Sequence, residues 1–239
     1  MPDPAAVERL RAARASLLER IASACARAGR SAADVTLVAV SKTVSAERLV
    51  AAVAAGLDLL GENRVQEAAA KEPLVPGARW HLVGPLQSNK ARRAVELFEA
   101  IEAVDSLELA RRLARLAIEL GRAPLPIFCE VNVDRDPAKA GFDPAELEAA
   151  LPALAELAAP GRGLTLAGLM TIGRLAPEPE AARPTFVALR ELSEGLRRTA
   201  PALRAGLSMG MSDDFEVAIE EGATHVRVGR ALFGERPPR

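Results

Sequence analysis

Short apolar runs alternate with helical segments along the whole chain, and this alternation limits the possible folds more than any single motif does. We interpret eight runs as strands: Val35–Val40, Leu57–Gly61, Trp80–Gly84, Ala100–Val104, Ile127–Val133, Leu164–Ile172, Ala205–Met209 and Thr224–Gly229. Such alternation is typical of parallel strands that are joined by helical crossovers. Eight units of this kind in 239 residues predict a (β/α)8 barrel of the TIM type. A doubly wound open sheet is the alternative, because periodicity alone does not show whether the sheet closes.

Capping residues mark where the helices begin and end. An extra N-terminal helix is predicted over residues 4–28, because Asp3 is a good N-cap, Pro4 suits the first helical position and Gly29 follows the end. Further helices are predicted to begin at Ser45, Ser106, Asp143 and Ser212, and three of them to stop at Gly56, Gly121 and Gly222.

The chain has no Gly- or Ser-rich linker and no short repeat, so we expect a single domain over residues 1–239. A chain of this length can bury roughly 70–75% of the surface that it exposes when unfolded. The least regular stretch, from Arg174 to Pro184, is expected to be an ordinary connection between a strand and a helix.

Composition argues against several classes of partner. The 31 basic and 32 acidic residues leave a net charge of −1, which gives no electrostatic reason to expect nucleic acid or an anionic membrane. The two cysteines, Cys25 and Cys129, have neither metal-ligand spacing nor a disulfide pattern. The N-terminus carries charge where a signal peptide needs an apolar core, and no apolar run approaches the ~20 residues of a membrane span. We therefore expect a soluble, cytoplasmic protein without a metal.

In a barrel of this type, functional residues lie at the C-terminal ends of the strands. The first strand delivers Lys42 there, directly after Leu37–Val40 and Ser41. A lysine that is partly removed from water favours its neutral form, which is the nucleophile that captures a carbonyl group. Taken alone, such a lysine is more often a solvated strand end.

The last two strands add an anion site and a cation. Ser208 and Gly210, together with Gly229 and the start of the following helix, are typical of a phosphate cradle, because glycines let backbone N–H groups approach an anion. For either loop alone, glycines that only make a tight turn are an equally good interpretation. Arg227 lies between two valines, so alternation places it inside the barrel, where it needs a partner. That partner is either a structural carboxylate, Glu62 or Glu130, or the pyridine nitrogen of a cofactor.

A strand-end lysine, a phosphate cradle and an inward arginine together indicate a site for pyridoxal 5'-phosphate (PLP). Asn63 could hydrogen-bond the ring hydroxyl of that cofactor. For His81 we favour a satisfied core histidine over a position against the ring. A cation beside the pyridine nitrogen weakens the cofactor as an electron sink, so the pattern favours holding PLP over carbanion chemistry.

Six segments resemble the pyridoxal phosphate homeostasis protein family, whose members are similar to the N-terminal barrel of alanine racemase. They follow in family order: Ala39–Lys42, Gly61–Glu67, Trp80–Lys90, Gly168–Ile172, Leu207–Asp214 and Val226–Gly234. The resemblance implies a cytosolic carrier or regulator of PLP supply that has no established turnover reaction.

The resemblance also implies a role for individual residues. Lys42 would carry PLP as a Schiff base, and Arg227 would face the pyridine nitrogen, with Asn63 beside the ring. Ser208, with the backbone of Gly229 and Arg230, would bind the phosphate.

Two positions depart from the common form of the family. Arg64 stands where an aromatic residue is frequent, and Arg230 stands where threonine is frequent. The second change matters little if Arg230 binds phosphate through its backbone N–H.

Three other functions compete with a PLP carrier that supplies apo-enzymes. A two-base racemase of the alanine racemase kind takes a tyrosine from a second domain, and this chain contains no tyrosine. A barrel enzyme that forms a Schiff base with a phosphorylated metabolite is the next alternative. A scaffold without a ligand leaves the strand-end residues unexplained. We expect a non-catalytic monomer or weak dimer.

Overall fold

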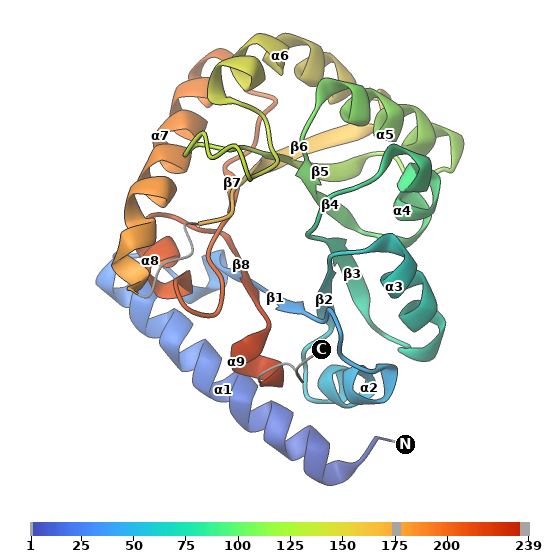
Figure 1. Cartoon of the computed structure of the whole chain (residues 1–239), viewed down its shortest axis with the longest axis vertical. Helices are drawn as coiled ribbons and strands as arrows, with labels where there is room; N and C mark the ends of the chain where they lie inside the picture. The colour runs from blue at the N-terminus through green and yellow to red at the C-terminus, as the bar shows by residue number, and fades with distance from the viewer. Residues whose placement is uncertain (1, 174–177, 235–239) are drawn as a thin grey trace.

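The computed structural model describes residues 2–173 and 178–234. Within these residues, eight parallel strands pair in chain order, and the last pairs with the first (Figure 1). The strands are β1 (Thr36–Val40), β2 (Leu59–Glu62), β3 (Arg79–Leu82), β4 (Ala100–Val104), β5 (Leu125–Glu130), β6 (Leu164–Met170), β7 (Gly206–Ser208) and β8 (His225–Val228). The prediction of a closed (β/α)8 barrel is confirmed.

The sequence pattern did not show whether the sheet closes into a barrel. Residues Thr36–Ala39 of β1 pair in register with His225–Val228 of β8, so the sheet has no free edge and the open-sheet alternative is wrong. Each predicted strand is present, with ends that differ by a few residues. The largest difference is in β5, which begins at Leu125 and ends at Glu130.

Helices surround the strands on the outside. They are α1 (Pro4–Arg27), α2 (Ala46–Ala54), α3 (Val65–Lys71), α4 (Ala91–Leu97), α5 (Leu107–Glu119), α6 (Pro144–Leu157), α7 (Arg183–Thr199), α8 (Phe215–Glu220) and α9 (Arg230–Phe233), with short 3-10 turns η1 (Ala32–Asp34), η2 (Glu72–Leu74), η3 (Ser88–Lys90) and η4 (Pro179–Ala182). Of the predicted connection from Arg174 to Pro184, residues 174–177 lie outside the described residues, Pro179–Ala182 form η4, and α7 begins at Arg183.

The capping predictions hold at most helix starts. Asp3, Ser45 and Ser106 each accept a hydrogen bond from a backbone N–H of the first turn of α1, α2 and α5. At α6, the side chains of Asp143 and Glu146 form the reciprocal capping box. These bonds satisfy N–H groups that a helix leaves without internal partners.

One predicted helix start is wrong. The helix expected from Ser212 begins instead at Phe215, as α8. The carboxylate of Asp214 accepts a hydrogen bond from the backbone N–H of Met211 at 2.6 Å, and its own N–H donates to the Met211 carbonyl at 3.2 Å. Residues 212–214 therefore form a turn that precedes the helix, and Ser212 is left outside it.

The extra N-terminal helix covers the place where the barrel closes. α1 runs along one side of the molecule and packs against α2, α8 and α9 (Figure 1). Leu10, Leu17 and Ile21 are among its buried residues, and Arg20 and Arg27 form ion pairs with Glu216 and Glu220 of α8. α1 thus ties the first strand–helix unit to the last.

The apolar core has two parts, as alternation along a strand requires. The larger part lies between the strands and the helices and includes Leu60, Leu82 and Ile101. Inside the barrel lie two small clusters, one around Val38 and one around Phe128. The interior also holds charged groups, which are described with the site.

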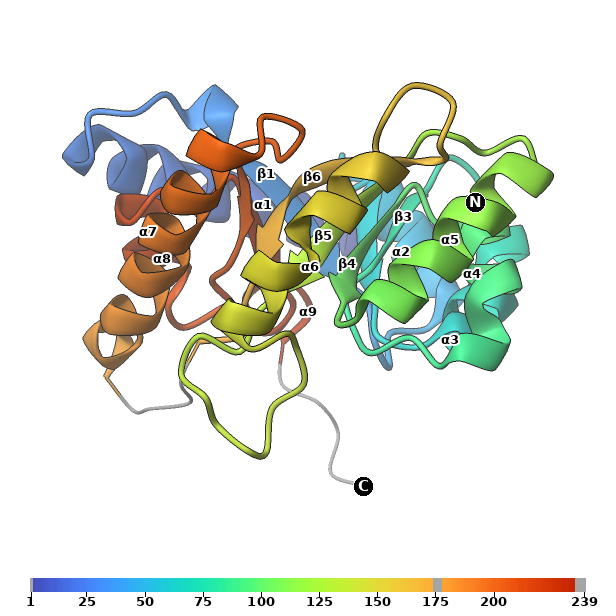
Figure 2. The ribbon, with the colours of Figure 1, turned by 90° about the horizontal axis from the view of Figure 1, so that it is seen from above.

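The strands deliver their C-terminal ends to one side of the barrel. The loop between β5 and α6 projects on that side, where α9 also lies (Figure 2).

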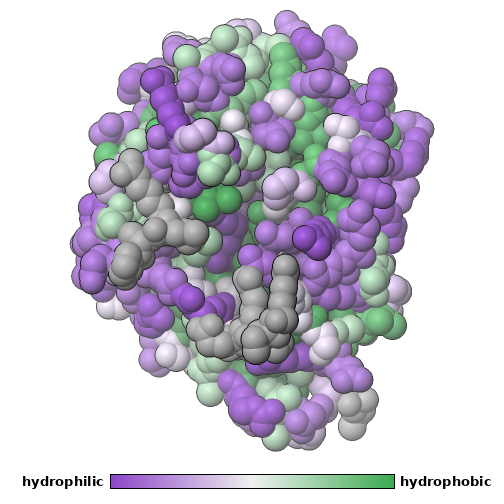
Figure 3. Space-filling model, in the orientation of Figure 1, coloured by the Kyte–Doolittle hydropathy of each residue, from purple (hydrophilic) through white to green (hydrophobic). Residues whose placement is uncertain are grey.

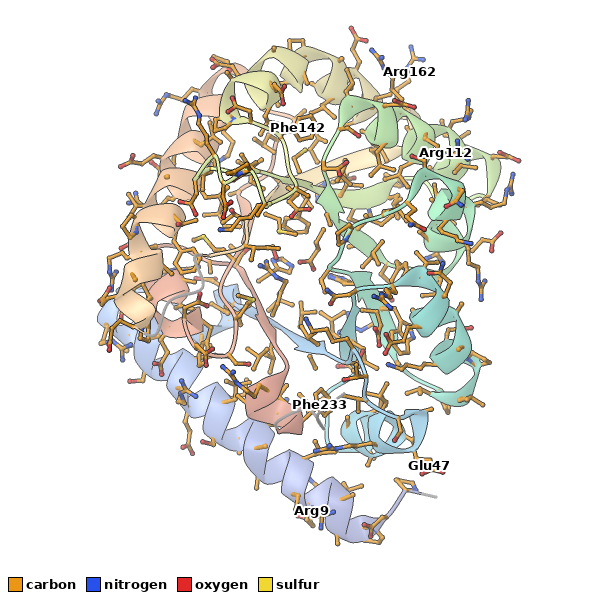
Figure 4. The ribbon with its side chains drawn as sticks, viewed as in Figure 1. Arg9, Glu47, Arg112, Phe142, Arg162 and Phe233 are labelled. Carbon is orange, nitrogen blue, oxygen red and sulfur yellow. The ribbon has the colours of Figure 1, made fainter. Side chains whose placement is uncertain are left out.

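The face seen in Figure 3 is largely hydrophilic, with apolar side chains toward its middle. Arg9, Arg112 and Arg162 lie on the outer surface, away from the strands (Figure 4). No helix within residues 2–173 and 178–234 is both long and apolar enough to cross a membrane.

The C-terminal residue of β5, Glu130, is a buried carboxyl group. It is 4% exposed, and its Oε2 atom has no hydrogen-bond partner among the described residues. Burial raises the pKa of Glu130 to about 6, although the nearby charge of Arg227 lowers it. An acid whose pKa is higher in the folded state than in the unfolded state destabilises the fold once it ionises.

We therefore expect Glu130→Gln to stabilise the protein at alkaline pH. The gain should be about 2 kcal/mol at pH 8, because the ionised carboxylate is removed. It should vanish at pH 4, below the ordinary carboxyl pKa of 4.5, where folded and unfolded chains both carry the proton. Denaturant unfolding of the variant and the parent protein at both pH values tests this. An equal difference at pH 8 and pH 4 would contradict the titration of Glu130.

Candidate functional site

Lys42 lies at the mouth of the barrel, directly beyond β1. Val38 and Val40 pack in an apolar cluster inside the barrel, and Lys42 follows two positions later. Its neighbour Ser41 is fully buried, and Lys42 itself is partly buried. The pairing of Val38 with Arg227 in β8 brings the first and last strands together at this point.

Arg227 is the cation inside the barrel, and it is 5% exposed. Its Nη1 donates to Ser208 Oγ at 2.6 Å, and its Nη2 donates to the Thr171 carbonyl at 2.8 Å. The sequence suggested Glu62 and Glu130 as structural partners of Arg227. Glu62 instead accepts a hydrogen bond from Lys71. The charge of Glu130 acts to raise the pKa of Arg227. Burial lowers the pKa of Arg227, and the charge of Glu102 opposes that shift.

Glu102 of β4 completes the chain of polar contacts across the interior. Ser208 Oγ donates to Glu102 Oε2 at 2.6 Å, and His81 Nδ1 lies 2.6 Å from Glu102 Oε1. Burial alone would raise the pKa of Glu102. The hydrogen bond from His81, together with the charges of His81, His225 and Arg227, lowers it to about 2. His81 is thus a satisfied core histidine, as the sequence favoured.

Glu102 was not predicted as a site residue, although its place in the sequence is a signal. It is the charged residue in the middle of Ala100–Val104, a strand that is otherwise apolar and entirely buried. A carboxylate in such a run needs a partner. The identity of that partner depends on barrel closure, which brings β4, β7 and β8 around the same interior.

Ser212, rather than Ser208, meets the backbone after β8. The Oγ atom of Ser212 accepts long hydrogen bonds from the N–H groups of Gly229, at 3.3 Å, and Ala231, at 3.4 Å. Ser208 does not join this group, because its hydroxyl is held between Glu102 and Arg227. An oxygen atom therefore already lies where these backbone donors converge.

Two glycines allow the loops after β7 and β8 to approach their neighbours. Gly210 has φ +91°, and a Cβ atom there would lie 2.6 Å from the Cβ of Ala218. A Cβ atom on Gly229 would lie 3.1 Å from the carbonyl oxygen of Val40. Gly229 therefore seats the last loop against the strand that carries Lys42.

Arg230 is exposed, and its side chain forms an ion pair with Asp213. The guanidinium is thus directed to a neighbouring loop. The role of the Arg230 backbone N–H in phosphate binding stays a prediction.

Asn63 follows β2 at the same end of the barrel and is partly buried. The backbone of Gly84 lies against it, since a Cβ atom on Gly84 would be 2.8 Å from both the Cα atom and the carbonyl oxygen of Asn63. Arg64 is exposed and is the N-cap residue of α3. The strands β8, β1 and β2 are neighbours, so Arg227, Lys42 and Asn63 occupy one sector of the barrel.

This sector offers an amine, a buried cation, an amide and a set of anion-binding donors. The residues described contain no group of three or more His, Cys, Asp and Glu side chains that could hold a metal ion. The chemistry it suits is capture of a carbonyl compound that also carries an anionic group.

Comparison with known proteins gives a consistent result. Residues 16–237 match the family model for the alanine racemase N-terminal domain. The pyridoxal phosphate homeostasis protein of Pseudomonas aeruginosa is 43% identical over 224 residues, which cover 93% of this chain and 94% of that protein. The protein of the same name from Escherichia coli is 41% identical over 231 residues, with coverage of 93% and 94%.

The solved structures of PipY from Synechococcus elongatus resemble this one closely. The structure without PLP has a TM-score of 0.80 at 46% identity, and the structure with PLP bound has a TM-score of 0.78 at 45% identity. Both alignments cover 91% of this chain and 99% of PipY. This protein therefore belongs to the alanine racemase N-terminal domain family, and within it to the pyridoxal phosphate homeostasis proteins.

Proposed function

We propose that this protein binds PLP at the mouth of the barrel, with Lys42 as the attachment point, and serves intracellular PLP homeostasis as a carrier. The observation that carries the proposal is the sector formed by β7, β8, β1 and β2, which gathers Lys42, Asn63, Ser212, Arg227 and Gly229. PipY, which has PLP bound in one of its structures, supports it at 45% identity.

Each residue of the sector has a distinct role in this proposal. When bound, PLP supplies an aldehyde that an unprotonated primary amine captures reversibly. Lys42 provides that amine at the end of β1. Ser212 and the backbone N–H groups of Gly229 and Ala231 would hold the phosphate, and Asn63 would bind the ring hydroxyl. Arg230 would contribute through its backbone.

Ser212 replaces Ser208 as the phosphate-binding serine. The Ser208 hydroxyl already accepts from Arg227 and donates to Glu102, both at 2.6 Å inside the barrel. Ser208 would then act indirectly, by holding Arg227 in place. Arg227, a fixed cation, would face the pyridine nitrogen and disfavour its protonation, which weakens the electron sink that racemases need.

A carrier is favoured over a racemase by the groups that are present. A racemase needs a second acid or base opposite the lysine. The sequence contains no tyrosine, and the buried carboxylate Glu102 is committed to His81 and Ser208.

We further propose that the recipients are apo-enzymes that use PLP and that the protein works in the cytoplasm, where Cys25 and Cys129 stay as unpaired buried thiols. The family match over residues 16–237 supports a single domain.

Replacing Lys42 by Ala should abolish the covalent step. The visible absorption band of lysine-bound PLP should be lost, and binding should weaken by about tenfold or more, since one covalent contact is removed. Borohydride fixation followed by peptide mapping should place the cofactor on Lys42 in the parent protein. Lys90→Ala is the matched control, because Lys90 lies in η3, within the connection that follows β3. Fixation on Lys71, Lys90 or Lys139 in the parent protein would overturn the assignment.

Replacing Ser212 by Ala should weaken the phosphate contact selectively. A hydrogen bond to a charged group contributes about 1.5–3 kcal/mol, so PLP affinity should fall roughly tenfold or more. Pyridoxal, which lacks the phosphate, should bind the variant and the parent protein alike. Ser208→Ala is the comparison, and it should affect both ligands to the same extent by releasing Arg227. A phosphate-selective loss in Ser208→Ala and none in Ser212→Ala would return the role to Ser208.

A carrier should pass PLP on faster than it releases it to solvent. Protein loaded with PLP is mixed with an apo-enzyme that needs PLP, with and without an excess of a carbonyl scavenger that traps free PLP. Reactivation should proceed at a similar rate in both mixtures. Reactivation that stops when the scavenger is present, or turnover of D- and L-amino acids by the loaded protein alone, would favour simple release or the racemase alternative.

A further inference from the structure

A buried lysine of α3 touches the backbone beside Lys42. Lys71 is 8% exposed, and its Nζ donates to the Ser41 carbonyl at 2.9 Å, to Glu62 Oε1 at 2.7 Å and to Glu67 Oε1 at 2.7 Å. Three acceptors saturate an ammonium group. One of those acceptors is the peptide group that joins Ser41 to Lys42.

Glu67 holds the other side of Lys42. Its Oε1 atom accepts a hydrogen bond from the backbone N–H of Thr43 at 2.6 Å. Thr43 has φ +67°, a left-handed conformation that a β-branched residue rarely adopts. Such a conformation persists only where surrounding contacts fix it, and it is found mainly at functional sites.

Ser41 is fixed by its side chain as well. Its Oγ atom donates to Glu62 Oε1 at 2.8 Å, and its backbone N–H donates to the Gly61 carbonyl at 2.9 Å. We call the side chains of Lys71, Glu67 and Glu62 the clamp, since together they bind the residues on both sides of Lys42.

The clamp is an ionic arrangement in which the Lys71 ammonium bridges two carboxylates. Burial would raise the pKa of Glu67, but hydrogen bonds from Lys71 and from the Thr43 backbone lower it overall. For Glu62, burial is the larger effect, and its pKa is raised. Lys71 forms an ion pair with each carboxylate at 2.7 Å, and its pair with Glu67 joins the Ser41 carbonyl to the Thr43 N–H.

An ion pair that only attached α3 to β2 would not need to contact the segment after β1. The pair of Lys71 and Glu67 does contact it, at the two peptide groups on either side of Lys42. These contacts restrict the backbone of Lys42, so the Cα atom from which its side chain extends has a fixed position. Ordering a reactive group before the ligand arrives lowers the cost of binding.

We propose that Lys71 and Glu67 are positioning residues that hold the backbone on both sides of Lys42, so that its amine is ordered before PLP binds. This inference rests on the proposed role of Lys42. It adds two residues that contact neither the ring nor the phosphate in the proposed site. Loss of the clamp should weaken the covalent capture of PLP and leave non-covalent recognition of the ring and phosphate intact.

The test compares two ligands on Lys71→Met, Lys71→Arg and the parent protein. PLP can join Lys42, whereas pyridoxine 5'-phosphate has an alcohol in place of the aldehyde and can only bind non-covalently. For Lys71→Met we expect PLP affinity to fall about tenfold and pyridoxine phosphate affinity to change less than about twofold. Lys71→Arg keeps the charge and should restore part of the PLP affinity. Lys90→Met is the matched control outside the clamp.

A second readout needs no cofactor. Hydrogen exchange of the Thr43 amide in the protein without ligand should be at least about tenfold faster in Lys71→Met, because the Glu67 carboxylate loses its partner. Glu67→Gln keeps an oxygen acceptor but removes the ion pair, so it should show a smaller increase. It also carries the test if Lys71→Met does not fold.

The outcomes separate the clamp from the proposed function. Wild-type PLP affinity in a folded Lys71→Met variant, or an equal loss for both ligands, overturns the positioning role. If Lys42→Ala binds PLP as the parent protein does, the proposed function fails, and Thr43 exchange still reports on the clamp. Unchanged Thr43 exchange in both Lys71→Met and Glu67→Gln would refute the clamp itself.

Discussion

Every feature of the site depends on the pairing of β1 with β8. This contact closes the sheet, and it places the first strand of the chain beside the last (Figure 1). Lys42 and Arg227 lie far apart in the sequence but on adjacent strands in the barrel. The close approach of Gly229 to the Val40 carbonyl is a further result of closure. α1 reinforces the junction from outside, because it packs against α2, α8 and α9.

Closure also creates a demanding interior, since a buried guanidinium needs partners on several strands. Arg227 of β8 obtains them from Ser208 of β7 and the Thr171 carbonyl, and Glu102 of β4 balances the charge through Ser208. These contacts fix the cation, and they also engage the Ser208 hydroxyl as both donor and acceptor. The Ser208 hydroxyl donates its one proton to Glu102 in this arrangement, so that proton is not directed to a phosphate. We therefore propose Ser212 for the anion-binding role, because it lies next to the backbone N–H groups of Gly229 and Ala231.

The sequence predicted those features that local patterns determine. The strands, the caps at Asp3 and Asp143, the strand-end position of Lys42 and the inward Arg227 all follow from alternation and capping chemistry. The sequence pointed to Ser208 for the phosphate, whereas we propose Ser212, four residues later, and this choice depends on how the chain turns after β7, which strand alternation does not determine. The start of α8 was wrong for the same reason, since Asp214 closes a turn that the pattern reads as helix. Glu102 and Lys71 were missed because their roles depend on neighbours from other strands or helices.

A crystal structure of the protein with PLP is the measurement that tests the central claim most directly. The account predicts continuous density between the Nζ atom of Lys42 and the cofactor, with the phosphate beside Ser212 and the Gly229 N–H and the ring nitrogen facing Arg227. The clamp on the residues that flank Lys42 should be unchanged from the structure described above. Cofactor density attached to Lys90 or Lys139, or a phosphate located away from Gly229, would contradict it.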